Sequence, residues 1–575
     1  MRHGRHQRKA LCGPPPPSVI CKKSPNRVEI LELQQALRLD HLGSVPIVDR
    51  PQPGHPRVAI EHIEQLVEHW SRLVEGKVGA PATSTKASTQ CKGGRCPWGA
   101  NTEASSVTPA VIPFGSYALG ARGVASDLDL LVLAPPSIHR GDFFTELVRV
   151  LEDDSRCQHV QPISSAYTPV IKFVYVIVEE NGKSTMLPID LVFAKVANTA
   201  KLVAYHRQKN SERVALYTLD DTDIDGLDEE GIRSLNGARV SQIILRSVPD
   251  VAKFRDVLCT IKHWAQLRGI YSNALGFLGG VSWAIMVAYV CQTSRIEAST
   301  AEVVRSFFAL FSKWDWTYPV VLNGHIAHVP PVTNVSLQTR AIDITAWNPV
   351  DNPKDGQHLM QIITPAYPSM NSSFNVKMAQ LRRIQSELQR MAVCLQYQRQ
   401  RGIGLQHLLS SPTNFFNLNR DFVQVTISAD SAETFVPWFR WVETKLRCLI
   451  CNLETEHIET RPFSRFFDSP HNPFEKRFYV ALRFKNEDAC ASADESIQAL
   501  QMDFLHQVNQ WTNRKPDMSI TISTTTEVPN VTTATDRCVI DKDERSTVSE
   551  TTAPPTDDEE DDSVGSAASC FVRKI

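Results

Sequence analysis

A glycine–serine pair followed by two aspartates in an apolar segment constrains this chain more than any other feature. Phe114-Gly115-Ser116 is separated by ten residues from Asp127-Leu-Asp129, which runs into the apolar stretch Leu130–Ala134. Side chains two positions apart in a strand point to one face of a sheet, so the two carboxylates are expected to lie together. Their charges repel unless a cation lies between them, and acids among apolar neighbours are costly without a partner. Hard oxygen ligands of this kind suit Mg²⁺ or Mn²⁺.

A third carboxylate is expected to complete this metal site. Asp190, within the apolar stretch Leu187–Phe193, lies in a further strand candidate. Two ions held in this way would activate an attacking hydroxyl and stabilise a leaving pyrophosphate. Gly115 would let the backbone approach a phosphate, and Ser116 would add a hydroxyl donor. Taken singly, each motif is more often a turn or a solvated strand end, but their combination inside apolar sequence favours a functional site.

The composition is that of a globular chain of several domains. The 575 residues suffice for three to four domains at roughly 150 residues each. No run of about 18 apolar residues occurs, so no membrane span is expected, and the basic N-terminus lacks the apolar core of a secretory leader. The 13 cysteines are odd in number and scattered, which favours reduced thiols in the cytosol or nucleus.

Charge is distributed unevenly although the net charge is only −2. The segment from Asp536 to Asp562 holds eleven acidic and three basic residues, whereas the first 23 residues hold six basic and no acidic ones. The long middle of the chain is therefore near neutral. A polyanion would have to bind in a local groove rather than on a basic face.

Periodicity divides the chain into α+β units. Apolar spacing predicts helices over 58–74, 256–268, 278–291 and 378–395, and strands over 127–134, 170–178 and 187–193. A strand–helix–strand–helix order between Val423 and Trp511 predicts a small ferredoxin-like domain. The expected division is a flexible basic and proline-rich arm over 1–30, a catalytic domain over 31–199 with an inserted loop at 76–108, a helical central domain over 200–365, a ferredoxin-like domain over 366–513 and a disordered tail over 514–575.

Three longer stretches make a family resemblance plain. They are Ile261–Ala284, containing Gly279-Gly-Val-Ser-Trp283; Phe311-Ser-Lys-Trp-Asp-Trp316; and Trp347-Asn-Pro followed by His358–Pro368. With the Gly-Ser and Asp-x-Asp motifs, the sequence resembles a eukaryotic nuclear-type poly(A) polymerase of the DNA polymerase β-like nucleotidyltransferase superfamily, from about Val58 to Trp511. The resemblance implies a polymerase β-like nucleotidyltransferase domain, a helical central domain and an RRM-like RNA-binding domain.

The resemblance also implies roles for individual residues. Asp127, Asp129 and Asp190 would be catalytic and would hold two metal ions, Mg²⁺ or Mn²⁺. The nucleotide would be bound by Phe114, Gly115, Ser116, Asn236, Lys262, Tyr271, Gly280, Val281 and Thr364. Of these, Asn236 would meet the ribose or base, Lys262 and Tyr271 the triphosphate and base, and the last three the adenine. The RNA primer would touch Tyr167, Lys172 and Asn375.

The implied activity is template-independent transfer of adenylate from ATP to RNA 3′ ends, as in mRNA polyadenylation. A monomeric nuclear enzyme is expected, with RNA, ATP and cleavage and polyadenylation factors as partners and no membrane. Two alternatives stay open. A terminal uridylyltransferase, or a transferase of another nucleotide, is disfavoured by Gly279–Trp283 and the C-terminal unit, and a non-catalytic RNA-binding scaffold is disfavoured because all three carboxylates are present.

The sequence departs from the family pattern in three places. The turn over 120–126 lacks the histidine often found there, and Arg122 is the candidate to replace it at a phosphate. The loops over 76–108 and 178–186 are longer than is usual in the family.

Overall fold

The computed structural model describes residues 55–78, 107–123, 126–179, 182, 184–209, 219–224, 226–324, 346–401, 409, 414–485 and 487–527. The arm expected over 1–30, most of the loop expected over 76–108 and the tail from 528 onward lie outside these residues. Among the described helices, none is both long enough and apolar enough to cross a bilayer.

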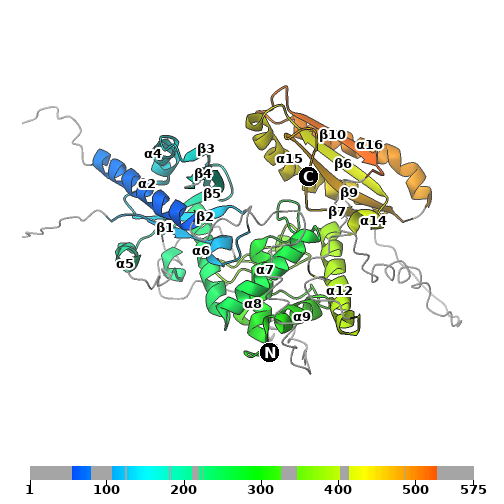
Figure 1. Cartoon of the computed structure of the whole chain (residues 1–575), viewed down its shortest axis with the longest axis horizontal. Coiled ribbons are helices and arrows are strands. Elements are labelled where there is room, and N and C mark those ends of the chain that lie inside the picture. Colours follow the sequence, from blue (N-terminus) through cyan, green and yellow to red (C-terminus); the bar gives the residue numbers. More distant parts are fainter. Residues whose placement is uncertain are drawn as a thin grey trace, which may run out of the picture. The chain divides into compact units, whose positions relative to one another are not determined.

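The first unit is a five-stranded sheet in the order β1-β2-β5-β4-β3 (Figure 1). Its strands are β1 (Ala110–Pro113), β2 (Leu128–Ala134), β3 (Cys157–Ile163), β4 (Val170–Val178) and β5 (Ser184–Lys195). Only the β2–β5 pair is parallel, and the other three pairs are antiparallel. Strand β2 is almost continuously apolar because both faces of the sheet are covered, as is usual for a strand at the centre of a layered fold.

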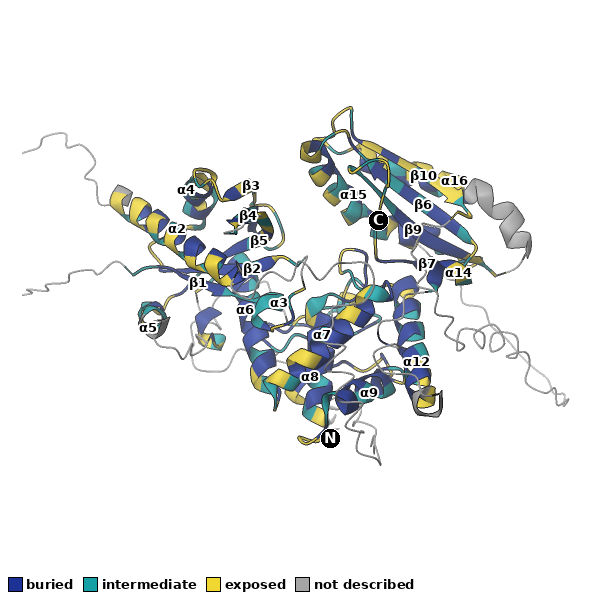
Figure 2. Cartoon of the chain, viewed as in Figure 1, coloured by how far each residue is buried: buried dark blue, intermediate teal, exposed yellow. Residues whose placement is uncertain are grey.

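Helices cover both faces of this sheet. Helices α2 (His55–Val78) and α4 (Arg140–Glu152) pack on one face, where Trp70 and Phe143 are fully buried. Figure 2 shows α2 with an exposed stripe along one side, as its three-and-four spacing of apolar residues predicts. Helix α6 (Glu229–Ser247) packs on the other face through Ile232 and Leu235, next to α5 (Thr199–Lys209) and the short 3₁₀ helix η2 (Asp221–Ile224).

The middle of the chain is helical, as predicted. Its elements are α7 (Val251–Leu267), α8 (Gly280–Thr293), α9 (Thr300–Phe311), η3 (Leu322–Gly324), α11 (Pro353–Gly356) and α12 (Met378–Arg401). Trp264 of α7 meets Trp283 of α8 edge-on at 6.1 Å between ring centroids and Phe308 of α9 at 4.7 Å. These three side chains are fully buried, so aromatic packing fixes how the three helices meet.

The third unit has a five-stranded antiparallel sheet: four strands follow the order β10-β6-β9-β7, and the short β8 pairs with β9 beside this path. Its elements are α14 (Phe415–Leu418), β6 (Asp421–Ser428), α15 (Ala432–Leu453), β7 (Ile458–Pro462), β8 (Phe467–Asp468), β9 (Glu475–Phe484), α16 (Glu487–Asn509) and β10 (Ser519–Thr525). Leaving aside α14 and the short β8, this β-α-β-β-α-β order confirms the predicted ferredoxin-like fold.

Strand β10 corrects the expected start of the tail at residue 514. It pairs with β6 along its whole length, from Ser519 opposite Ser428 to Thr525 opposite Phe422. Trp438 of α15 donates its indole N–H to the Ser519 carbonyl at 2.9 Å, and Met518 is buried. The domain therefore needs residues that its composition had assigned to disorder.

Candidate functional site

Three carboxylates meet at the end of the parallel β2–β5 pair. Asp129 of β2 and Asp190 of β5 are direct partners in the strand register, and Asp127 immediately precedes β2. One carboxylate oxygen from each lies within 4.8 Å of the others, and of the three residues only Asp127 is exposed. The alternation of buried neighbours places Asp129 and Asp190 on the sheet face that α6 covers. Strand register therefore brings together residues 61 positions apart.

The electrostatics of this cluster suit a divalent cation. Burial, with the charges of Asp127 and Asp190, raises the pKa of Asp129 to about 7, although Lys172 and Lys262 oppose the shift. Burial also raises the pKa of Asp190, and the ion pair with the Lys172 ammonium works against it. Three carboxylates at this spacing form a hard oxygen ligand set, and a bound cation would remove their mutual repulsion.

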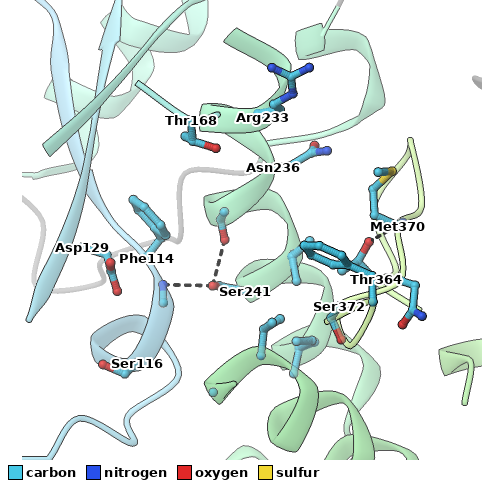
Figure 3. Close-up of a pocket in the computed structure, with 18 of the residues that line it drawn as sticks. Phe114, Ser116, Asp129, Thr168, Arg233, Asn236, Ser241, Thr364, Met370 and Ser372 are labelled. Atoms are coloured by element: carbon cyan, nitrogen blue, oxygen red, sulfur yellow. Dashed lines mark hydrogen bonds between the residues drawn. The ribbon is translucent and has the colours of Figure 1, made fainter. Parts of the chain in front are cut away.

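The Gly115–Ser116 turn is held against α6, beside the carboxylates. The Gly115 N–H donates to Ser241 Oγ at 3.1 Å, and Ser241 donates in turn to the Gly237 carbonyl at 3.0 Å (Figure 3). Gly115 has φ of +61°, and a Cβ there would overlap the Asp129 carboxylate, so only glycine fits. Ser116 Oγ is buried and has no hydrogen-bond partner among the described residues. A hydroxyl in this state fits a ligand oxygen next to the carboxylates.

All nine residues predicted to bind nucleotide line one cavity of about 960 Å³. They come from the β1–α3 turn (α3, Gly115–Ala118), α6, α7, the segment between α7 and α8, α8 and the loop after α11. The walls also include Asp127, Asp129 and Tyr167. Sequence separation among these residues reaches about 250 positions, so the fold, not local spacing, assembles the pocket.

Lys262 is buried and lines the pocket. Its position on the apolar helix α7 was also compatible with a solvent-exposed lysine, and the structure excludes that alternative. Its side chain donates to the Ala121 carbonyl at 2.7 Å and lies 5.9 Å from the centre of the Tyr271 ring. Burial lowers the pKa of Lys262, and burial raises the pKa of Tyr271 to about 12. Among the described residues the hydrogen bond of this ammonium is to a neutral carbonyl, and Asp127 and Asp129 act on it only through their charges, so an anionic ligand would stabilise it further.

Asn236 presents hydrogen-bond donors to the pocket because a neighbour fixes its amide. Arg239 donates to Asn236 Oδ1 at 2.7 Å, and an arginine can only donate, so the amide oxygen faces Arg239. Arg239 is itself buried and anchored by Asp221 and by the Tyr367 carbonyl. The Asn236 NH₂ group is thereby left for a ligand acceptor.

The adenine-side candidates are also in place. Gly280 begins α8, and Val281 beside it is 38% exposed within the cavity wall. Thr364 exchanges two hydrogen bonds with Met370, one through its hydroxyl and one through its backbone N–H, each at 2.9 Å. Thr364 and Met370 face the cavity from the same loop (Figure 3).

The three primer candidates are not brought together in the pocket. Tyr167 lines it, is 69% exposed, and carries the Arg233 guanidinium over its ring at 4.0 Å. Lys172 lies outside the lining and pairs with Asp190 instead. Asn375 is likewise outside the lining and donates weakly to Asn273 at 3.4 Å.

Arg122 lies next to the carboxylates but is turned inward. It donates to the Ser126 carbonyl, and burial lowers its pKa against the charge of Asp127. Its role at a phosphate stays a prediction.

Sequence reasoning missed several residues of the site. Ser241 positions Gly115 from 126 residues away, and Arg239 orients Asn236. Ser464 of the third unit bonds the backbone of Tyr271. None stands in a motif, so no spacing signal in the sequence marks them.

Three family models match successive parts of the chain. They describe the poly(A) polymerase nucleotidyltransferase domain over residues 99–248, the poly(A) polymerase central domain over 253–410, and the poly(A) polymerase predicted RNA binding domain over 414–477. The expected boundaries differ: the central match begins at 253 rather than 200 and extends past 365 to include α12, which packs on α9.

Curated relatives agree with these models. A poly(A) polymerase of Dictyostelium discoideum is 31% identical over 83% of this chain and 53% of its own length. Nuclear poly(A) polymerase 1 of Arabidopsis thaliana is 33% identical over 72% of this chain and 54% of its own length. The chain thus spans about half the length of these relatives.

Solved structures give a weaker likeness. A cytoplasmic RNA terminal U-transferase is 14% identical, with a TM-score of 0.36, over 62% of this chain and 92% of that one. A Cid1 poly(U) polymerase structure is similar at 14% identity and a TM-score of 0.34. Values this low carry no weight for function. The three consecutive domain matches and the two relatives place the chain in the eukaryotic nuclear-type poly(A) polymerase family.

Proposed function

We propose that the protein adds adenylate residues from ATP to RNA 3′ ends without a template, in the nucleus, with Mg²⁺ or Mn²⁺. The observation that carries the proposal is the single cavity, which joins two of the three carboxylates to all nine candidate nucleotide residues. Asp190 supports it from outside the lining through its place in the carboxylate cluster. Relatives named as nuclear poly(A) polymerases support the compartment and the base.

The carboxylates would hold two cations, which supply charge neutralisation and an activated hydroxyl. The chain's own residues then do the positioning. The backbone at Gly115 and the hydroxyl of Ser116 would bind phosphate oxygens, and Lys262 would balance the triphosphate charge. Asn236 would donate to an acceptor on the sugar or base, since Arg239 holds its oxygen. Such positioning and charge compensation supply most of the catalysis in phosphoryl transfer.

Primer extension tests the proposal directly. The full chain is incubated with an oligo(A) primer and each of the four nucleoside triphosphates in turn, with Mg²⁺ and with Mn²⁺. ATP should be incorporated, and only with a divalent cation. Preferential use of UTP would favour a uridylyltransferase, and absence of incorporation with either cation would overturn an enzymatic role.

Variants of the carboxylates locate the chemistry. Asp190→Ala should abolish extension, because the cation ligand set loses one of its three members. Asp503→Ala removes an exposed carboxylate of α16 as a matched control and should extend normally. Near-normal extension by Asp190→Ala would remove Asp190 from the site.

Base choice can be tested at Lys262. Contacts to base faces discriminate poorly, since every base has a π-face, so selection should come from correct seating of the whole nucleotide. Lys262→Ala should lower ATP use steeply and GTP use less, because GTP does not make the full set of contacts. Equal fold-losses would mean that Lys262 holds only phosphate.

A further inference from the structure

A row of polar side chains crosses the first sheet, starting at the carboxylates. Asp129 is opposite Asp190 in the β2–β5 register, Asp190 is opposite Lys172 in β4–β5, and Lys172 is opposite Gln161 in β3–β4. Residues directly opposite one another share a face, so all four side chains project from the same side of the sheet. With neighbouring strands about 4.8 Å apart, Gln161 lies about 10 Å from Asp190 along the row.

Along the row away from the carboxylates, the side chains become more exposed to solvent, and their charge changes from negative to positive. The side chains of Asp190 and Lys172 are 22% and 30% exposed, and Gln161 is exposed. The carboxylates therefore lie at the closed end, and the ammonium of Lys172 follows them. A negatively charged chain whose end must reach the carboxylates would find its first cation at Lys172.

The far end of the row meets the third unit. Arg440 of α15 donates a hydrogen bond to Gln161 Oε1 at 3.2 Å, although the two residues are 279 positions apart. Arg440 is exposed, and it makes no ion pair among the described residues. Arg233 of the pocket lining, by contrast, is paired with Glu229. The charges of Glu443 and Asp190 act on Arg440 without a close ion pair, and its hydrogen bond to Gln161 is to a neutral amide, so guanidinium donors of Arg440 stay available for a phosphate.

We propose that Lys172, Gln161 and Arg440 form the track of the RNA primer, with Arg440 binding a phosphodiester farther from the 3′ end than the one at Lys172. A guanidinium has several N–H donors in a geometry that matches phosphate oxygens, so Arg440 can keep its hydrogen bond to Gln161 while it binds a phosphate. The assignment rests on the proposed function for its substrate, and it adds a phosphate contact from the RNA-binding unit.

The track has a consequence for primer length. A dinucleotide primer such as ApA has a single phosphodiester, next to its 3′-terminal nucleoside, and this group lies nearest the carboxylates. A ten-residue oligo(A) also has phosphodiesters that extend to Arg440. Loss of the Arg440 side chain should therefore affect the long primer and spare the short one.

Primer binding by the full chain tests the proposal, measured by fluorescence anisotropy over a range of KCl concentrations. Arg440→Ala should weaken binding of the ten-residue oligo(A) about tenfold, the size expected for one hydrogen bond to a charged group. The slope of log K against log salt should fall by about 0.7, the value for one phosphate contact on a single strand. Arg440→Lys should restore the slope, because it keeps the charge.

The matched control is Lys445→Ala, which removes one charge from the same helix, where the ammonium lies over the Trp441 ring at 4.5 Å. An equal loss in both variants would mean diffuse attraction by the domain and would overturn the assignment of Arg440. Unchanged binding by Arg440→Ala would overturn it as well. In extension assays, the KM for ATP at saturating primer and the use of ApA should stay within about twofold of wild type. Because binding is measured apart from extension, the result at Arg440 stands even if the catalytic proposal fails.

Discussion

The backbone N–H of Tyr271, which lines the candidate nucleotide cavity, donates to Ser464 Oγ of the third unit at 3.1 Å. Ser464 in turn donates its own N–H to the Gly269 carbonyl at 3.0 Å. Gly269 has φ of +67°, and a Cβ there would overlap the Phe463 ring. The segment that carries Tyr271 is thus held by two hydrogen bonds to the third unit, so that unit shapes the candidate nucleotide cavity as well as the proposed primer track.

Removing the Ser464 hydroxyl should loosen Tyr271 without touching RNA. Ser464→Ala loses one hydrogen bond worth about 1 kcal/mol, so the KM for ATP should rise about fivefold while kcat changes less. Ser464→Thr keeps a hydroxyl and should recover most of the difference. The check is steady-state extension with primer affinity measured in parallel. A change in primer affinity with the KM for ATP unchanged would contradict a positioning role for Ser464.

The stability of the metal-free protein should depend on pH through Asp129. Because the pKa of Asp129 is raised to about 7, the folded state holds this proton while the unfolded state releases it near the ordinary pKa of an aspartate. The contribution of Asp129 to stability is therefore lost as the pH rises from about 4 to 7. Asp129→Asn abolishes this titration. In EDTA, the Tm of the variant relative to that of wild type should therefore rise between about pH 4 and 7 and stay constant above pH 7.

Thermal scans at several pH values measure this difference. With saturating Mn²⁺ at neutral pH, wild type should have the higher Tm of the two proteins, since only wild type keeps all three carboxylates. A Tm difference that does not vary with pH would contradict the environment assigned to Asp129.

Three arginines surround one carboxylate where the central helices meet. Glu387 of α12 accepts from Arg268 at 2.8 Å, from Arg383 at 3.2 Å and from Arg390 at 3.0 Å. Burial alone would raise the pKa of Glu387, but the three cations hold it below the usual range. Glu387→Gln should therefore lower the free energy of unfolding by about 3–5 kcal/mol, because it leaves buried cations without their anion.

Urea denaturation checks this loss against a surface pair. Glu61→Gln breaks the exposed Arg57–Glu61 contact of 2.8 Å and should cost no more than about 0.5 kcal/mol. Equal losses in the two variants would show that burial does not amplify the Glu387 interaction.

Strong apolar periodicity in the sequence predicted most of the fold, but it did not predict the polar edge strands of the third unit. Helices with long apolar stripes and the central strands β2, β4, β6 and β9 were predicted from sequence. Strands β7 and β10 were not, because Ile458–Pro462 holds two charged residues and Ser519–Thr525 consists mostly of serine and threonine. An edge strand has only one neighbour and one packed face, so its sequence need not be apolar.

Truncation tests the role of β10. A chain that ends after residue 527 should keep wild-type stability of the third unit. A chain that ends after residue 513 loses β10, exposes the edge of β6 and frees the Trp438 indole N–H from Ser519. It should unfold at lower temperature and aggregate, as measured by scattering during a thermal scan. Identical behaviour of the two chains would contradict the assignment of β10 to the domain.

Some residues of the candidate site could be predicted from local sequence pattern, others only from family resemblance, and a few not at all. Asp127, Asp129, Asp190 and the Gly115–Ser116 turn follow from local pattern. The other candidate nucleotide residues were predicted from family resemblance, because the elements that carry them are far apart in the chain. Arg440 and Ser464 could not be found either way, since strand register and a loop of another domain bring them to the site.

Aromatic rings occupy one face of the sheet in the third unit. Phe422 of β6 and Tyr479 of β9 pack with Phe416 at 5.5 and 5.6 Å, and Phe415 stacks on Phe463 at 5.0 Å. RRM domains use such rings to stack bases, but here Phe422, Phe463 and Tyr479 are almost fully buried. Helix α14 of the same unit covers Phe422 and Tyr479, and Phe463 also lies against Gly269 of the central domain, so this face is closed to bases. A contact of the third unit with RNA must therefore come from another surface, such as the α15 surface that carries Arg440.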